Sequence, residues 1–302
     1  MISELDVESY DDIQQLFERS LQLWPEERRP PIQSLLDQLK EGGSKGLVSI
    51  YVSRDDDDAF TGYVSIGRRS NSISFCYANE DNTLEKEFLQ LALNELKENG
   101  KAVKAGGPWV TPQISQQLFS LGFNKYDRKS MTLEKDTVES LPVPSQPEEI
   151  TLHAYDTEMK EEVVDLIYAA NIENIDIHVF PEFFSERDLV AKLVQDTENS
   201  RWGTWRDGIS KVLTKERKII GVCFWTMQDT IGYIPEIAIH PDYKRKGLGR
   251  YILVASMKAL LDEADDLTGF RLDVTMDNPA RNLYESVGFK DDVHYSMYSW
   301  IP

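Results

Sequence analysis

The chain has 302 residues, of which 41% are hydrophobic, and this length favours two domains over one. Its 52 acidic residues outnumber its 33 basic residues, and the formal net charge is −19. A surface this negative argues against nucleic acids and anionic membranes as partners. Residues 1–6 lack the basic and apolar regions of a signal peptide, and the apolar run 219–225 is too short to cross a bilayer. We therefore expect a cytoplasmic protein.

The cysteines and histidines limit the disulfide and metal chemistry that is expected. Cys76 and Cys223 both fall in predicted strands, and two thiols do not make a disulfide framework. We expect both to be buried free thiols. None of the four histidines pairs with a cysteine or a second histidine at metal-ligand spacing, so no metal site is expected.

The chain contains an internal repeat. An amphipathic helix is predicted after Tyr10-Asp11, and a second one after Tyr155-Asp156. Further on, a Gly-Phe pair and then a Ser-Met pair recur at an offset of 166 residues (288 − 122 and 296 − 130). The residues concerned are Gly122, Phe123, Ser130 and Met131, then Gly288, Phe289, Ser296 and Met297. Two tandem copies of one fold account for this pattern.

The boundary between the copies is predicted at residues 137–149, where three prolines and several acidic residues indicate an extended linker. The domains are then 1–136 and 150–302. In the second, the pattern predicts a mixed α/β unit whose elements follow in chain order. They are a strand near 150–153, helices to about 192, strands at 208–213, 218–227 and 233–240, a helix at 244–262, a strand at 270–275, a helix at 280–286 and a strand at 293–300.

The segment 237–250 carries the strongest functional signal. Two glycines, Gly247 and Gly249, open a helix after a short β-branched run, and glycine lets a backbone approach a ligand closely. The helix adds the positive end of its dipole. The four cationic side chains there are Lys244, Arg245, Lys246 and Arg250. This combination favours a pyrophosphate-binding loop, with a solvated basic surface as the alternative.

A second motif follows at residues 277–289, where a strand, a turn, a short helix and a Gly C-cap are predicted. Together the two motifs resemble the GNAT superfamily of acyl-CoA-dependent N-acyltransferases. The family's phosphate loop, [Q/R]-x-x-G-x-[G/A], is matched by residues 244–249 with lysine in first place. Its N-x-x-A-x-x-L-Y-x-x-x-G-F is matched with Asp277 at the asparagine position and Asn278 one place late. The resemblance covers residues 150–302.

The resemblance implies that acetyl-CoA, or another acyl-CoA, is the co-substrate and that it enters between two strands that splay apart. The main chain of the first of these strands would contact the pantetheine arm. The implied cofactor-binding residues are Ile237, Ala238, Ile239, Lys244, Arg245, Lys246, Gly247, Leu248, Gly249, Arg250, Asp277, Asn278 and Arg281.

Two residues are candidates for catalysis. Glu236 lies where the family often places a general base, and Pro235 before it indicates a bulge. Tyr284 falls at the family's tyrosine position and would protonate the leaving sulfur. The alternatives are a surface glutamate at a strand edge and a tyrosine that only packs on the sheet.

The first copy is predicted to have lost this chemistry. Its corresponding segment, 77–87, contains no glycine and four acidic residues, which would repel a pyrophosphate. The position that matches Tyr284 is Leu118, which cannot donate a proton. The layout is similar to that of mycothiol synthases.

We expect an acetyl-CoA-dependent N-acetyltransferase that acts on a primary amine of a small molecule by direct attack. By resemblance, residues 171–184 would shape the acceptor pocket. A non-catalytic CoA-binding or interaction protein remains the alternative from another class. Either would be a monomer or a homodimer.

Overall fold

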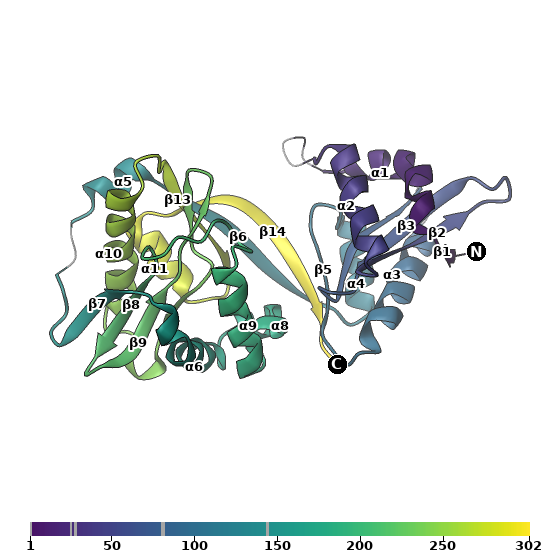
Figure 1. Ribbon diagram of the computed structural model, residues 1–302. Helices are drawn as coiled ribbons and strands as arrows, with labels where there is room; N and C mark the ends of the chain where they lie inside the picture. Colours follow the sequence, from purple (N-terminus) through teal and green to yellow (C-terminus); the bar gives the residue numbers. More distant parts are fainter. Residues whose placement is uncertain (1, 25, 27–28, 80–81, 143–144) are drawn as a thin grey trace. The chain divides into compact units, whose positions relative to one another are not determined.

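The computed structural model describes residues 2–24, 26, 29–79, 82–142 and 145–302 (Figure 1). The chain forms two compact units, each a mixed α/β structure in which helices flank a sheet. The first unit comprises Met1–Tyr126 and Tyr295–Pro302, and the second comprises Asp127–His294. Across the described ranges, the helices are too short or too polar to span a membrane.

The first unit contains a sheet with the strand order β1-β2-β3-β4-β5-β14, in which β4 and β5 run parallel. Its strands are β1 (Ile2–Glu4), β2 (Val48–Arg54), β3 (Phe60–Gly67), β4 (Ser72–Ala78), β5 (Val103–Gly106) and the end of β14 (Lys290–Trp300). Its helices are η1 (Val7–Ile13), α1 (Gln14–Leu21), α2 (Ile32–Ser44), α3 (Asn82–Lys97) and α4 (Pro112–Ser120).

Alternation along the strands explains how this sheet is covered on both faces. Ile50 and Val52 of β2 pack in one core with α1 and α2, whereas Tyr51 packs in the other core with α3 and α4. The first helix begins earlier than the sequence pattern indicates. Asp6, rather than Asp11, caps it, by accepting a hydrogen bond from the backbone N–H of Glu8.

The second unit contains two sheets, with the strand orders β6-β13-β11-β10 and β12-β9-β8-β7. The strands are β6 (Asn124–Glu134), β7 (Ile150–Ala154), β8 (Lys211–Lys215), β9 (Lys218–Cys223), β10 (Thr226–Gln228), β11 (Ile231–Tyr233), β12 (Ile237–Ile239) and β13 (Gly269–Thr275). The helices are α5 (Lys135–Ser140), η3 (Thr157–Met159), α6 (Lys160–Asn171), α7 (Asp176–Val179), α8 (Pro181–Phe184), α9 (Arg187–Glu198), η4 (Pro241–Tyr243), α10 (Leu248–Glu263) and α11 (Ala280–Val287).

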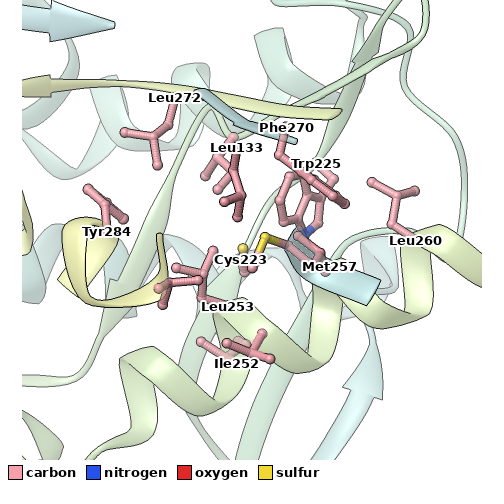
Figure 2. Close-up of a cluster of buried hydrophobic side chains, with 14 of the residues drawn as sticks. Leu133, Cys223, Trp225, Ile252, Leu253, Met257, Leu260, Phe270, Leu272 and Tyr284 are labelled. Atoms are coloured by element: carbon pink, nitrogen blue, oxygen red, sulfur yellow. The ribbon is translucent and has the colours of Figure 1, made fainter. Parts of the chain in front are cut away.

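Two cores hold this unit together. One lies under α10 and α11 and includes Cys223, Trp225 and Tyr284 (Figure 2). The other lies under α6 and α9. Neighbouring residues of β8, Val212 and Leu213, divide between them, as strand alternation requires. Both cysteines are buried free thiols, as the sequence predicts.

The two copies exchange their last strands, a feature that the predicted boundaries do not contain. In the second unit, Met131 of β6 lies opposite Leu272 of β13, and both face the core. In the first unit, Tyr298 of β14 lies opposite Ala105 of β5, and both face the core. Strand β5 of the first copy is thus paired with β14, the last strand of the second copy. Strand β13 of the second copy is paired with β6, the last strand of the first. In the structure Tyr298 corresponds to Met131, whereas the Ser-Met repeat aligns Met297 with Met131. The alignment of the two copies is therefore shifted by one residue in this strand.

The predicted linker also differs from the structure. Residues 135–140 form α5, and Val138 is buried in the core of the second unit. An extended conformation would leave this apolar side chain in water, so packing overrides the linker-like composition. The sequence stretch begins with helix and becomes irregular only beyond Ser140; residues 143 and 144 lie outside the described ranges.

We predict that Tyr298→Ala lowers the unfolding free energy of the first unit by about 3–5 kcal/mol, because it removes a buried ring. The Tyr298 side chain is buried, and its hydroxyl donates a hydrogen bond to Ser115 Oγ at 2.7 Å. Tyr298→Phe is the matched control and should cost about 1 kcal/mol, the usual contribution of one hydrogen bond. Hydrogen exchange at amides 103–106 in increasing denaturant measures both. Unchanged protection in Tyr298→Ala would show that β14 does not stabilise this unit.

Candidate functional site

A β-bulge at Pro235 lets one strand leave its neighbour. Ile234 and Ile237 both pack on the core under α10, although residues three apart in a regular strand face opposite sides. One extra residue between them explains this, as expected from Pro235. Before the bulge, β11 runs beside β13, and the N–H of Ile234 donates to Arg271 O at 3.0 Å. After it, β12 pairs with β9 instead.

The bulge leaves main-chain groups of β12 directed away from its partner. Glu236 O accepts from the N–H of Phe224 at 2.9 Å, and the N–H of His240 donates to Ile220 O at 2.9 Å. In an antiparallel pair, alternate residues bond to the same neighbour. The N–H and C=O groups of Ile237 and Ile239 therefore point to the side from which β13 has diverged. These are the groups that the sequence pattern assigns to a pantetheine arm.

The two glycines of the basic loop have different roles. Gly247 has φ 78° and caps α10, and a Cβ built there would meet open space. Gly249 instead permits packing, because a Cβ there would lie 3.2 Å from Leu283 Cδ2. The first α-helical bond runs from the N–H of Tyr251 to Gly247 O at 3.0 Å. The N–H groups of residues 248–250 precede it and form the positive end of a 16-residue helix.

The cationic side chains around this helix end are exposed, and three of them donate to main-chain carbonyls. Lys244 Nζ bonds to Ala170 O at 3.0 Å, Lys246 Nζ to Asp242 O at 2.8 Å, and Arg250 to Ser286 O at 2.9 Å. Arg245 has φ 63°. Arg250 also donates to Ser286 Oγ at 3.1 Å, and the bond of Lys244 is partly buried, so an anion at this helix end would compete with existing contacts of these side chains.

Glu236 follows the bulge and is half-buried beneath the end of α6. Burial raises the pKa of its carboxyl to about 8. The charge of Asp176 raises this pKa further, and a hydrogen bond from the Asn171 side chain lowers it. A carboxyl with this pKa is a much stronger base than a surface glutamate.

Tyr284 reaches the same place from α11. It is buried, and burial raises the pKa of its hydroxyl, with the charges of Glu236, Cys223 and Asp176 adding to the effect. Burial also raises the pKa of the Cys223 thiol to about 12. The thiol is therefore kept protonated and is a poor nucleophile. The charge of Glu236 thus acts on the hydroxyl of Tyr284, although the two predicted catalytic residues come from different elements.

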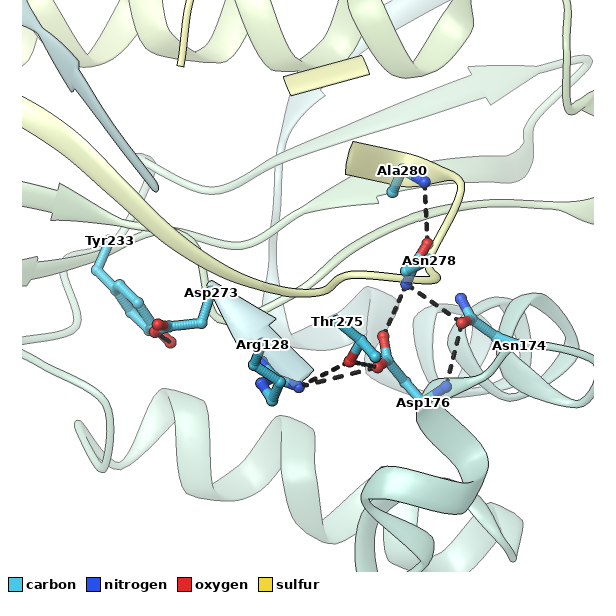
Figure 3. Close-up of polar contacts among 8 residues, drawn as sticks. All are labelled: Arg128, Asn174, Asp176, Tyr233, Asp273, Thr275, Asn278 and Ala280. Carbon is cyan, nitrogen blue, oxygen red and sulfur yellow. Dashed lines mark hydrogen bonds and ion pairs between the residues drawn. The ribbon is translucent and has the colours of Figure 1, made fainter. Parts of the chain in front are cut away.

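Asp176 stands at the centre of a polar network that the sequence did not reveal (Figure 3). Its carboxylate accepts hydrogen bonds from the hydroxyl of Thr275 and from Asn278 Nδ2, the latter at 2.8 Å. Arg128 of β6 lies 3.8 Å from it and donates to Thr275 Oγ1 at 3.2 Å. The Arg128 guanidinium also lies over the Phe180 ring, 4.5 Å from its centroid. Strand exchange thus brings a residue of the first copy into this site.

The remaining residues predicted to bind cofactor differ in their surroundings. Asn278 is buried, and its side-chain oxygen accepts from the N–H of Ala280 at 2.9 Å while its amide holds Asp176. Its observed contacts are therefore structural ones. Asp277 is exposed beside it, and Arg281 forms an ion pair with Glu285 at 2.7 Å.

The first copy retains the bulge without the polar residues. Ile73 is the last residue of β4 to pair with β5, and Ser74 is then the extra residue in the register. The next residue is Phe75, at the place of Glu236, and its ring stacks on Trp24 with centroids 5.6 Å apart. Leu118, at the place of Tyr284, is fully buried. Residues 80 and 81 of the glycine-free segment lie outside the described ranges.

Known proteins match this arrangement. Residues 206–291 match the family model described as an acetyltransferase (GNAT) domain. This part of the chain, which contains the glycine loop and the helix of Tyr284, is similar to GNAT acetyltransferase domains. An N-alpha-acetyltransferase of Sulfurisphaera tokodaii is 41% identical over 61 residues, which are 20% of this chain and 36% of that protein. Within the described residues, no group of three or more His, Cys, Asp or Glu could hold a metal ion.

Solved structures extend the likeness of fold to the whole chain. A GCN5-related N-acetyltransferase from Sphaerobacter thermophilus has a TM-score of 0.62 and 14% identity, with 99% of this chain and 95% of that one covered. A tandem GNAT protein from the clavulanic acid biosynthesis pathway has a TM-score of 0.57 and 11% identity, with 99% and 98% covered. The tandem GNAT fold predicted from the repeat is confirmed.

We predict that Glu236→Gln raises the melting temperature, and more so as the pH rises. The folded pKa of about 8 lies above the unfolded value, so the folded state holds an extra proton between roughly pH 4.3 and 8. Wild-type stability therefore falls as the pH rises through this window, whereas the glutamine variant lacks this loss. Melting curves from pH 5 to 9 test it, with exposed Glu162→Gln as the control. A constant difference across that range would contradict a raised pKa.

Proposed function

We propose that the chain transfers the acetyl group of acetyl-CoA to a primary amine of a small molecule, by direct attack of the amine. The observation that carries the proposal is the divergence of β12 from β13 at Pro235, with a glycine-opened helix end on one side and Glu236 on the other. Each part of a thioester-dependent acyl transfer has a group of suitable chemistry there.

The residues around the end of α10 fit the diphosphate of a CoA molecule. Gly247 presents open space, the first-turn N–H groups point outward, and the exposed cations surround them. The main chain of Ile237 and Ile239 supplies donors and acceptors for an extended amide-bearing arm. When bound, acetyl-CoA supplies an activated acyl thioester.

Glu236 and Tyr284 divide the proton chemistry. The attacking amine must be neutral, and a carboxylate whose conjugate acid has a pKa of about 8 can take a proton from an ammonium group. Tyr284 remains protonated because its pKa is raised, so its hydroxyl can donate a hydrogen bond to the sulfur as charge develops there. Full transfer from so weak an acid is unfavourable, and the proton held by Glu236 is the better source for the thiolate. The protonated Cys223 argues against an acyl-enzyme.

The decisive test is release of thiol from acetyl-CoA across a panel of primary amines. The panel should include peptides with free N-termini, because one relative is named an N-alpha-acetyltransferase. Turnover with small amines that is lost in Glu236→Gln supports the proposal. Turnover restricted to peptides would show that the acceptor is a peptide N-terminus instead of a small amine. Tight binding of acetyl-CoA without thiol release would instead favour a CoA-binding interaction protein.

We predict that Gly247→Asp abolishes acetyl-CoA binding, because its carboxylate would occupy the place of the diphosphate. Gly247→Asn is the matched control, since both residues tolerate the left-handed conformation at φ 78° and only one carries a charge. Calorimetric titration should give one site per chain for wild type, a moderate loss for asparagine and no binding for aspartate. Equal affinities for the two variants would exclude the electrostatic explanation, and two sites would show that the first copy also binds.

We predict that Tyr284→Phe lowers kcat by about 10²-fold, the lower end of the range for removing one hydrogen-bond donor to a developing charge. Its dissociation constant for acetyl-CoA should change little, because the hydroxyl acts mainly in the transition state. The ring still packs, so stability should hold, whereas Tyr284→Ala should also lose stability through the cavity it leaves. Wild-type turnover in Tyr284→Phe would show that Tyr284 contributes only to packing.

A further inference from the structure

Asp176 keeps the capacity to bind another donor. Its carboxylate offers about four acceptor positions, and the network supplies a hydroxyl from Thr275, an amide from Asn278 and the more distant guanidinium of Arg128. The ion pair of 3.8 Å is longer than a direct charged hydrogen bond. The Asp176 side chain is still 19% exposed, whereas that of Arg128 is 7% exposed. A cation can therefore reach the carboxylate although the guanidinium is enclosed.

The charges around Asp176 favour such a cation. Arg128 donates to Thr275 Oγ1 and lies over the Phe180 ring, and it approaches the Asp176 carboxylate only to 3.8 Å. The negative charge of Asp176 still acts on the carboxyl of Glu236 and the hydroxyl of Tyr284, and it raises the pKa of both. The two carboxyl groups are therefore near enough for their charges to interact. An ammonium group between them would be stabilised by both.

Three aromatic side chains form a row of ring contacts that begins at Arg128. The Phe180 ring lies under the Arg128 guanidinium. The ring centroids of Phe180 and Phe183 are 6.0 Å apart, and those of Phe183 and Trp202 are 5.8 Å apart. All three are half-buried, and the Arg201 guanidinium lies over Phe183 and Trp202, 5.5 and 4.7 Å from their centroids. An acceptor whose ammonium meets Asp176 would place an apolar body of modest size against these rings.

Resting on the proposed function, we propose that Asp176 binds the ammonium group of the acceptor beside Glu236, and that Arg128 of the exchanged strand positions Asp176. The substrate class is a cationic primary amine with an aromatic body. Thr275 and Asn278 fix the carboxylate so that it meets the ammonium without rearranging.

The proton balance follows from this placement. The ammonium gives one proton to the carboxylate of Glu236 and becomes an amine that Asp176 still holds through a remaining N–H. The amine nitrogen forms a bond to the thioester carbonyl carbon, and the carbon–sulfur bond breaks with its electron pair on sulfur. The sulfur takes the proton from Glu236, and the amide nitrogen releases its second proton to solvent. One ammonium and one thioester therefore give one amide, one thiol and one free proton.

The test uses the full chain and calorimetric titration with 2-phenylethylamine, compared with 3-phenylpropanoate, an anion with a similar body. Wild type should bind the amine and not the anion. Asp176→Asn should weaken amine binding by about 10- to 100-fold, the effect of losing one charge-assisted hydrogen bond. Asp188→Asn, the same substitution at an exposed position of α9, should leave the affinity within about twofold of wild type.

A wild-type protein that binds both compounds alike, or neither, overturns the proposal, as does unchanged amine affinity in Asp176→Asn. Acetyl-CoA affinity reports whether that variant is folded. If it is lost, Arg128→Lys decides, because lysine keeps the charge but cannot bond to Thr275 and cover Phe180 together. Its amine affinity should fall, and an unchanged affinity overturns the positioning role. Asp176-dependent binding without thiol release would refute the proposed function and leave the ammonium site standing.

Discussion

The single extra residue at Pro235 is the constraint on which the site depends. It moves one continuous segment from a sheet with β13 to a sheet with β9, because the hydrogen-bonding edge changes while the chain continues. The same shift puts Glu236 on the face covered by α6 and directs the main chain of Ile237 and Ile239 toward the departed strand. The proposed acid–base chemistry and main-chain recognition would therefore both depend on one backbone irregularity. Phe75 shows that the bulge alone does not supply a carboxyl group, since the first copy keeps the bulge and has an apolar ring in place of Glu236.

Strand exchange makes the last strand of the first copy part of the second unit. Residues 127–134 of β6 complete the sheet of the second unit, although they follow the helix and the Gly-Phe pair of the first copy. Without them β13 would lose its antiparallel partner, and Asp176 would lose the guanidinium of Arg128. The first copy therefore contributes packing and a positive charge to the second unit through its last strand, and this contribution does not depend on residues 77–87 or on Leu118.

The sequence predicts local features of this fold well and the exchanged contacts poorly. The glycine that caps α10, the bulge residue and the helix of Tyr284 follow from glycine, proline and apolar spacing, which act over a few residues. The exchange does not, because two copies of one strand carry the same pattern and either can pair with β13. Residues 135–140 have a linker-like composition and are helical because Val138 finds a core. Asn278 matches a cofactor motif by position, yet its side-chain amide donates to Asn174 and Asp176, which only the tertiary structure brings near.

The electrostatics of the site explain why two carboxyl groups are present where one base would serve. A lone glutamate made basic only by burial would oppose the approach of an ammonium, since a dry site disfavours any isolated charge. Asp176, held ready by Thr275 and Asn278, offers the ammonium a fixed negative partner while it makes Glu236 more basic. As the cation enters, its charge favours ionisation of Glu236, and the new carboxylate then stands next to the proton that must be removed. In the proposed mechanism, binding of the acceptor ammonium and ionisation of Glu236 are thus coupled. A neutral or anionic acceptor would not favour ionisation of Glu236.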